Sequence, residues 1–162
     1  MMGEQLSEHF SLRELTRSDI ALRNGIDNTP TEIHLKNLIL LCEQVLEPVR
    51  AHFGPVRINS GYRCLALNML VNPITSAPHN ISKHALGQAA DFEVDGVPNP
   101  EVAEWCRDHL PEYHQIILEF VTRGVPNSGW VHVSFVEDFQ KRECLTALRE
   151  GGKTVYHQGL VV

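Results

Sequence analysis

The sequence predicts an α+β protein in which N-terminal helices pack on a small, mainly antiparallel sheet. In residues 32–53 apolar side chains recur every three or four positions, as they do on one face of an amphipathic helix. Further along the chain, apolar and polar residues alternate in several short segments, which is typical of strands with one buried face. A chain in which helices come first and strands dominate later belongs to the α+β class.

The N-terminal third is expected to be helical. A capping box at residues 11–14 starts a short helix, for which Gly25 is a plausible stop. A second capping box at residues 29–32 has a proline at its first helical position. Pro48 is expected to kink or interrupt the helix that follows, before Gly54 ends it. That helix carries an apolar stripe of Leu35, Leu38, Cys42, Val45, Val49 and Phe53.

Strands are predicted in the remainder of the chain at residues 56–60, 88–94, 115–120 and 130–136. Helices are expected over residues 65–72, from residue 99 onward, and near residues 143–149. The polar, proline-containing segment 72–83 is expected to be a loop. Two glycines at 151–152 begin a hairpin-like last segment.

Composition and charge exclude several classes of function. The chain has 162 residues, a formal net charge of −6 and scattered basic residues, so no nucleic-acid footprint is expected. No apolar run approaches the ~20 residues that span a bilayer. The four cysteines form no Cys-x-x-Cys pair and are expected to be reduced. The N-terminus does not resemble a signal peptide, so we expect synthesis in the cytoplasm.

The predicted strands place polar groups on a common surface. Because successive side chains of a strand point to opposite faces, Asp91, Glu119 and His132 each lie opposite an apolar face. If the apolar faces pack on the helices, these three side chains share the other face of an antiparallel sheet.

Together with His84, this surface suits a catalytic zinc ion. His84, Asp91 and His132 supply two imidazoles and one carboxylate, whereas a structural zinc normally recruits four ligands and often cysteine. Glu119 is the candidate base that accepts a proton from water and passes it to the leaving amine. Arg63 is the candidate cation for a substrate carboxylate or an oxyanion, although it could instead pair with a structural carboxylate.

Several motifs occur in the order known from one peptidase family. A Ser-x-His-x6-Asp signature, with glycine three after the histidine, is met by Ser82, His84, Gly87 and Asp91. A later histidine in a Trp-x-His strand is met by His132, and a Ser-Gly-Tyr-Arg element by residues 60–63. With segments 10–15 and 28–30, these motifs resemble the zinc D-Ala-D-Ala peptidases of the M15 type, especially their phage-associated branch.

The resemblance implies a Hedgehog/D,D-peptidase-like fold over residues 1–162 as one domain, with Zn²⁺ as its metal. It implies hydrolysis of peptidoglycan stem peptides by a phage-type lytic or wall-remodelling endopeptidase that acts at the bacterial cell wall once released or delivered. Two alternatives stay open: a D-Ala-D-Ala carboxypeptidase or dipeptidase, and a non-catalytic virion or wall-binding module. We expect a monomer. Many relatives place a catalytic glutamate where this chain has Gly129, so that role is expected to fall on Glu119.

Overall fold

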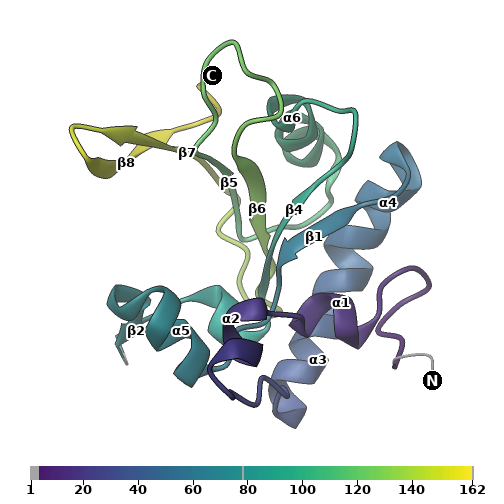
Figure 1. The fold of residues 1–162 in the computed structure, drawn as a ribbon. Helices are drawn as coiled ribbons and strands as arrows, with labels where there is room; N and C mark the ends of the chain where they lie inside the picture. The colour runs from purple at the N-terminus through teal and green to yellow at the C-terminus, as the bar shows by residue number, and fades with distance from the viewer. Residues whose placement is uncertain (1–3, 78, 162) are drawn as a thin grey trace.

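The structure is a computed structural model that describes residues 4–77 and 79–161. N-terminal helices pack on a mixed, mostly antiparallel sheet (Figure 1), which confirms the predicted α+β class. The helices are α1 (Leu12–Thr16), α2 (Asp19–Arg23), α3 (Glu32–Leu41), α4 (Glu47–Phe53), α5 (Leu65–Val71) and α6 (Asn99–His109). The strands of the main sheet are β1 (Arg57–Ser60), β4 (Ala89–Glu93), β5 (Gln115–Glu119), β6 (Trp130–Ser134), β7 (Glu143–Glu150) and β8 (Lys153–Gln158).

The order of the strands brings distant segments together. The main sheet runs β1-β4-β6-β5-β7-β8, and every neighbouring pair is antiparallel except β5 and β7, which are parallel. The neighbouring strands β4 and β6 pair with Asp91 opposite His132. On the other side of β6, Ile117 of β5 also lies opposite His132.

The long N-terminal helix is interrupted, as predicted, but the interruption precedes Pro48. A π-helical turn, η1 (Cys42–Leu46), separates α3 from α4, and Pro48 lies in the first turn of α4. Proline lacks an N–H and its ring crowds the carbonyl four residues earlier, so a wider turn just upstream relieves both problems. The predicted capping box is displaced, because Thr31 is the N-cap residue of α3. The capping box at Ser11 is confirmed, but two short helices, α1 and α2, replace the single helix.

The core lies between the helices and the apolar face of the sheet. The helices α3, α4 and α6 and the strands β4, β5 and β6 all contribute fully buried side chains to one cluster. Its members include Leu38, Leu41, Val49, Val102, Phe92, Ile116, Leu118 and Val131. Since alternate residues of these strands are buried in this cluster, the remaining residues face away from the helices. The polar face of the sheet is thereby left available for a site.

One predicted element is wrong. Residues 143–149 form the strand β7 and not a short helix. The segment contains leucine, alanine, glutamate and arginine, which favour helices in isolation. Here β7 lies between β5 and β8, pairing with β5 over residues 143–147 and with β8 over residues 145–150, so tertiary pairing overrides this preference.

The segment predicted as a loop over residues 72–83 contains short regular elements. A 3₁₀ turn, η2 (Pro73–Thr75), leads into a two-stranded ladder of β2 (Ser76–Ala77) and β3 (Asn80–Ile81). A second 3₁₀ turn, η3 (Lys83–Leu86), follows and carries His84. No helix of the described part of the chain is long and apolar enough to cross a membrane. The four cysteines are free thiols.

Candidate metal centre

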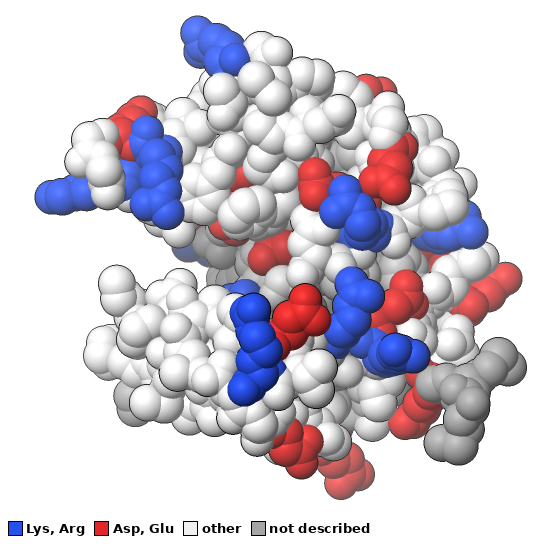
Figure 2. Space-filling view, in the orientation of Figure 1, with Lys and Arg blue, Asp and Glu red and all other residues white. Residues whose placement is uncertain are grey.

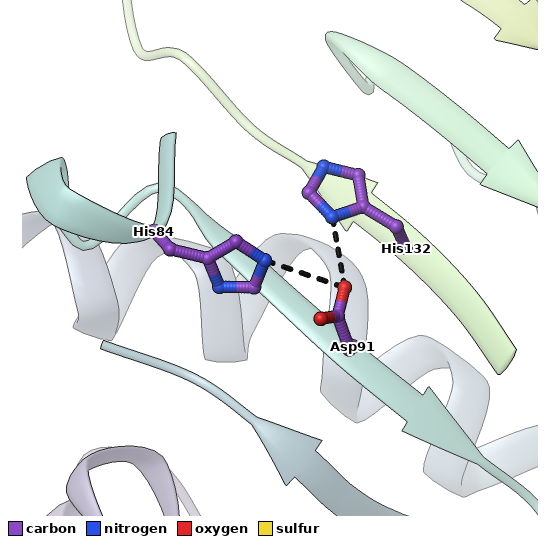
Figure 3. A group of neighbouring side chains, drawn as sticks. All are labelled: His84, Asp91 and His132. Atoms are coloured by element: carbon purple, nitrogen blue, oxygen red, sulfur yellow. Dashed lines mark hydrogen bonds and ion pairs between the residues drawn. The ribbon is translucent and has the colours of Figure 1, made fainter. Parts of the chain in front are cut away.

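The three predicted metal ligands converge on one point. Asp91 in β4 and His132 in β6 occupy paired positions of the ladder, so their side chains leave the same face of the sheet. His84 reaches them from η3, just before β4. Figure 3 shows a nitrogen of each imidazole ring directed at the same oxygen of the Asp91 carboxylate. All three residues are buried, with exposed fractions of 3% for His84 and 8% for the other two.

The distances fit a single ion. Oδ1 of Asp91 lies 2.9 Å from Nδ1 of His132 and 3.3 Å from Nε2 of His84 (Figure 3). One potential ligand atom from each residue lies within 4.8 Å of the others. Ligand atoms bonded at zinc distances in a tetrahedron lie roughly 3.3 Å apart. The donor set and its spacing therefore suit a divalent metal with three protein ligands.

A backbone contact orients His84. Its Nδ1 lies 2.7 Å from the carbonyl oxygen of Gly61, so Nδ1 donates the hydrogen bond and the Nε2 of the neutral ring carries a free lone pair. A metal-binding histidine is commonly oriented by such a contact through its other nitrogen. A side chain at position 61 would collide with the carbonyl of Leu15, at the end of α1. The glycine thus lets the N-terminal helix pack directly behind the site.

The charges within the group stabilise one protonation pattern. Burial alone would raise the pKa of Asp91, but the charges and hydrogen bonds of His84 and His132 hold it well below its usual range. Burial lowers the pKa of His84. For His132, burial lowers the pKa, but the hydrogen bond and the charge of Asp91, together with the charge of Glu119, raise it above the ordinary value. Asp91 is therefore ionised at neutral pH, as a metal ligand must be.

Glu119 stands beside the group, as predicted. It ends β5, and its Oε1 lies 3.7 Å from Nδ1 of His132. Burial and the neighbouring charge of Asp91 raise its pKa from 4.5 to about 7. A carboxyl group with a pKa near 7 exchanges protons readily at neutral pH. Glu119 thus has both the position and the acidity expected of a general base.

The structure gives a steric reason for Gly129. Its φ is +67°, and an added Cβ would collide with the backbone oxygen of Glu119 and lie 2.8 Å from the carbonyl carbon of Phe120. No side chain fits there without moving the strand end that carries Glu119. The buried Asn99 fixes this turn, because its amide donates to the carbonyl oxygens of Ser128 and Gly129.

Arg63 lies near the group without forming an ion pair with any described carboxylate, so the structural pairing considered above is not found. Its Nε donates to Oδ1 of Asn68 and its Nη1 to Oγ of Ser60, at 3.1 Å each. Burial lowers the pKa of Arg63, although the negative charges of Asp91 and Glu119 act in the opposite direction and raise it. Asn68, which is fully buried, is a positioning residue that sequence reasoning missed. An asparagine within a short helix carries no local signal of such a role.

The metal-ligand group lines a large cleft of about 1040 Å³, together with Glu119 and Arg63. Figure 2 shows a hollow between two lobes, and acidic atoms are visible within it. One wall comes from the β7–β8 hairpin and the other from the segment between α5 and η3. The sequence left open whether Trp130 belongs to the hydrophobic core or to the wall of a cleft, and the structure places it in the wall of this cleft. His79 also lies on the wall, is exposed, and does not belong to the ligand group.

A buried, metal-capable group in a cleft of this size suits a metal-dependent hydrolase. Comparison with protein families agrees: the model described as Peptidase M15 matches residues 8–134. The chain belongs to the Peptidase M15 family, whose members are metallopeptidases and act on peptides. No curated protein matches the chain.

Proposed function

We propose that this protein is a zinc-dependent peptidase that hydrolyses peptide bonds in peptidoglycan stem peptides, as a phage-type lytic or wall-remodelling endopeptidase. The observation that carries the proposal is the buried group of His84, Asp91 and His132, with Glu119 beside it in a wide cleft. Peptidoglycan as the substrate rests on the resemblance of the motifs. Action at the bacterial cell wall, after release or delivery from the cytoplasm, is part of the same proposal.

Zinc is the metal that the donor set favours. Two imidazole nitrogens and one carboxylate oxygen leave one position of a tetrahedron open, as in catalytic zinc sites. When bound there, zinc supplies a Lewis acid that polarises the scissile carbonyl and acidifies water. The protein's part is to orient His84 through its hydrogen bond to the Gly61 carbonyl, and to bring Asp91 and His132 together through the pairing of β4 with β6.

Glu119 supplies the proton transfers. Its carboxylate takes a proton from the attacking water and delivers it to the nitrogen of the leaving amine. Burial raises the pKa of Glu119, so the protonated carboxyl that delivers the proton is less disfavoured than it is for an exposed glutamate.

Arg63 orients the substrate. Two of its nitrogens are held by Asn68 and Ser60, so the guanidinium is fixed before the substrate binds. A fixed cation in the cleft can hold a substrate carboxylate or stabilise the negative charge that develops on the carbonyl oxygen. If it holds the terminal carboxylate of a peptide, the activity is that of a D,D-carboxypeptidase or dipeptidase, which is our second candidate.

Digestion of purified sacculi distinguishes the candidates. An endopeptidase releases new amino termini and soluble muropeptides, a carboxypeptidase releases free D-alanine, and a binding module sediments with the wall unchanged. We expect His132→Ala to abolish zinc binding and turnover, and Glu119→Ala to keep zinc and lose turnover. His109→Ala, on the distant helix α6, is the matched control and should keep both. Full activity of Glu119→Ala would remove Glu119 from the mechanism.

A further inference from the structure

The β7–β8 hairpin extends the face of the sheet that carries the metal centre. Glu119 of β5 is paired with Ala147 of β7, which is paired with Tyr156 of β8. Arg149 lies two residues beyond Ala147 and therefore on the same face. Phe120, Arg149 and Tyr156 all line the cleft. Arg149 and Tyr156 lie beyond residue 134, where the family match ends.

The guanidinium of Arg149 is oriented by an aromatic ring. It lies over the ring of Phe120, 5.4 Å from the ring centre. Phe120 itself is held in place, with a φ of +57°, a backbone hydrogen bond of 2.8 Å to Ala147, and Trp130 5.4 Å away. A guanidinium that contacts an aromatic ring through its face keeps its N–H donors free for other partners. Arg149 thus presents a pre-oriented set of donors to the cleft.

Arg149 has no acidic partner among the residues that the structure describes. Among residues 4–77 and 79–161, no carboxylate forms an ion pair with it, whereas Arg57, Arg107 and Arg142 each pair with at least one. It is also exposed. A guanidinium at the wall of a substrate cleft, unpaired within this part of the chain, is available for a carboxylate from outside.

The charge of the cleft differs in sign from that of the whole chain. The chain carries a net charge of −6. The charged residues that line the cleft are the cations Arg63, Lys83 and Arg149 and the anions Asp91 and Glu119. Since Asp91 belongs to the metal-ligand group, a bound divalent ion makes the cleft more positive still. Such a cleft attracts an acidic peptide and repels a basic one.

We propose that Arg149, whose guanidinium lies over the ring of Phe120, is a specificity-determining residue that binds a carboxylate of the substrate peptide. The inference rests on the proposed peptidase function and names the chemistry of its substrate. Arg149 lies one strand across from Glu119 and about 7 Å further along the sheet. An extended peptide advances about 3.3 Å per residue, so the carboxylate belongs to a residue about two positions from the scissile bond.

The test measures binding of two synthetic stem peptides that differ in one group. In one the α-carboxyl of the D-glutamyl residue is free, and in the other it is amidated. Affinities are measured by calorimetry on the zinc-loaded protein with Glu119→Gln, which separates binding from turnover. We expect the free acid to bind about tenfold more tightly at low salt, and this preference to shrink as salt screens the charge.

Variants of the hairpin locate the effect. Arg149→Gln should remove the preference, and Arg149→Lys should restore it in part, because lysine keeps the charge and loses the planar fork. Lys153→Gln is the matched control: it removes one positive charge from the same hairpin at a position outside the described cleft lining, and should leave the preference intact.

The two proposals can fail separately. A preference that depends on Arg149, in a protein that cleaves no sacculi, would uphold the carboxylate site and remove the hydrolase. Cleavage of sacculi by a protein that binds both peptides equally, or neither, would uphold the hydrolase and overturn the role of Arg149.

Discussion

Glu119 should make the metal-free protein less stable as the pH rises. Burial and the charge of Asp91 raise the pKa of Glu119 from 4.5 to about 7 in the folded protein. Between these two values the folded state holds a proton that the unfolded state has released, so the free energy of unfolding falls with increasing pH. The shift of about 2.5 units, at 1.36 kcal/mol each, corresponds to about 3 kcal/mol above pH 7.

Glu119→Gln removes this cost. Glutamine has nearly the same shape and stays neutral, so the variant should match the metal-free wild type at pH 4 and exceed its stability by about 3 kcal/mol at pH 8. The other titrating groups are common to both proteins, and their contributions largely cancel in the difference. Bound zinc should shrink the difference at pH 8, because a nearby cation favours the ionised carboxylate.

Urea denaturation in the presence of a chelator measures this difference, with tryptophan fluorescence as the probe, at intervals from pH 4 to pH 8.5. Glu47→Gln is a control of opposite sign. Burial by itself would raise the pKa of Glu47. The hydrogen bonds from Ser7 and His9 together have a larger, opposite effect, so the pKa in the folded protein lies below the unfolded value. Its stabilising contribution is present above the unfolded pKa and is lost as pH falls through the folded pKa. A difference between Glu119→Gln and wild type that does not change with pH, or a less stable variant at pH 8, would refute the reasoning.

Three further outcomes are expected. Gly129→Ala should lower the free energy of unfolding by about 2–4 kcal/mol, because the added Cβ would collide with the backbone at the end of β5. Gly124 also has a positive φ but has open space around it, so Gly124→Ala should lower the free energy of unfolding by only about 1 kcal/mol. Urea titration measures both values. Asn68→Ala should lower kcat/KM about tenfold with zinc content unchanged, since Arg63 loses its partner; kinetics and elemental analysis report the two quantities. Zinc at a thousandfold excess over its Kd should raise the free energy of unfolding by about 4 kcal/mol in the wild type and not in His132→Ala, as thermal melts would show.

The metal group could be found from the sequence because its determinants are local. Alternation along two strands placed Asp91 and His132 opposite apolar faces, and pairing of β4 with β6 then brings them together. The same reasoning predicted that Glu119 lies on the face that carries Asp91 and His132. Its raised pKa agrees with the role of general base that was assigned to it. Local periodicity suffices here, because a half-buried strand must alternate wherever it lies in the fold.

Other features had no local signal. The contact between His84 and the Gly61 carbonyl and the contact between Arg63 and Asn68 depend on how separate segments meet. Gly129 departs from the family pattern in the sequence, but the reason is visible only where its backbone touches the end of β5.

The sequence by itself determined the α+β class, the buried faces of the central strands and the residues able to hold a metal. Only the tertiary structure decided that residues 143–150 form a strand, and hence that Arg149 and Tyr156 stand in the wall of the cleft. The physical reason is that periodicity is a property of neighbouring residues, whereas a segment with mixed preferences takes the conformation of its partners. Here those partners are β5 and β8, whose hydrogen bonds β7 completes.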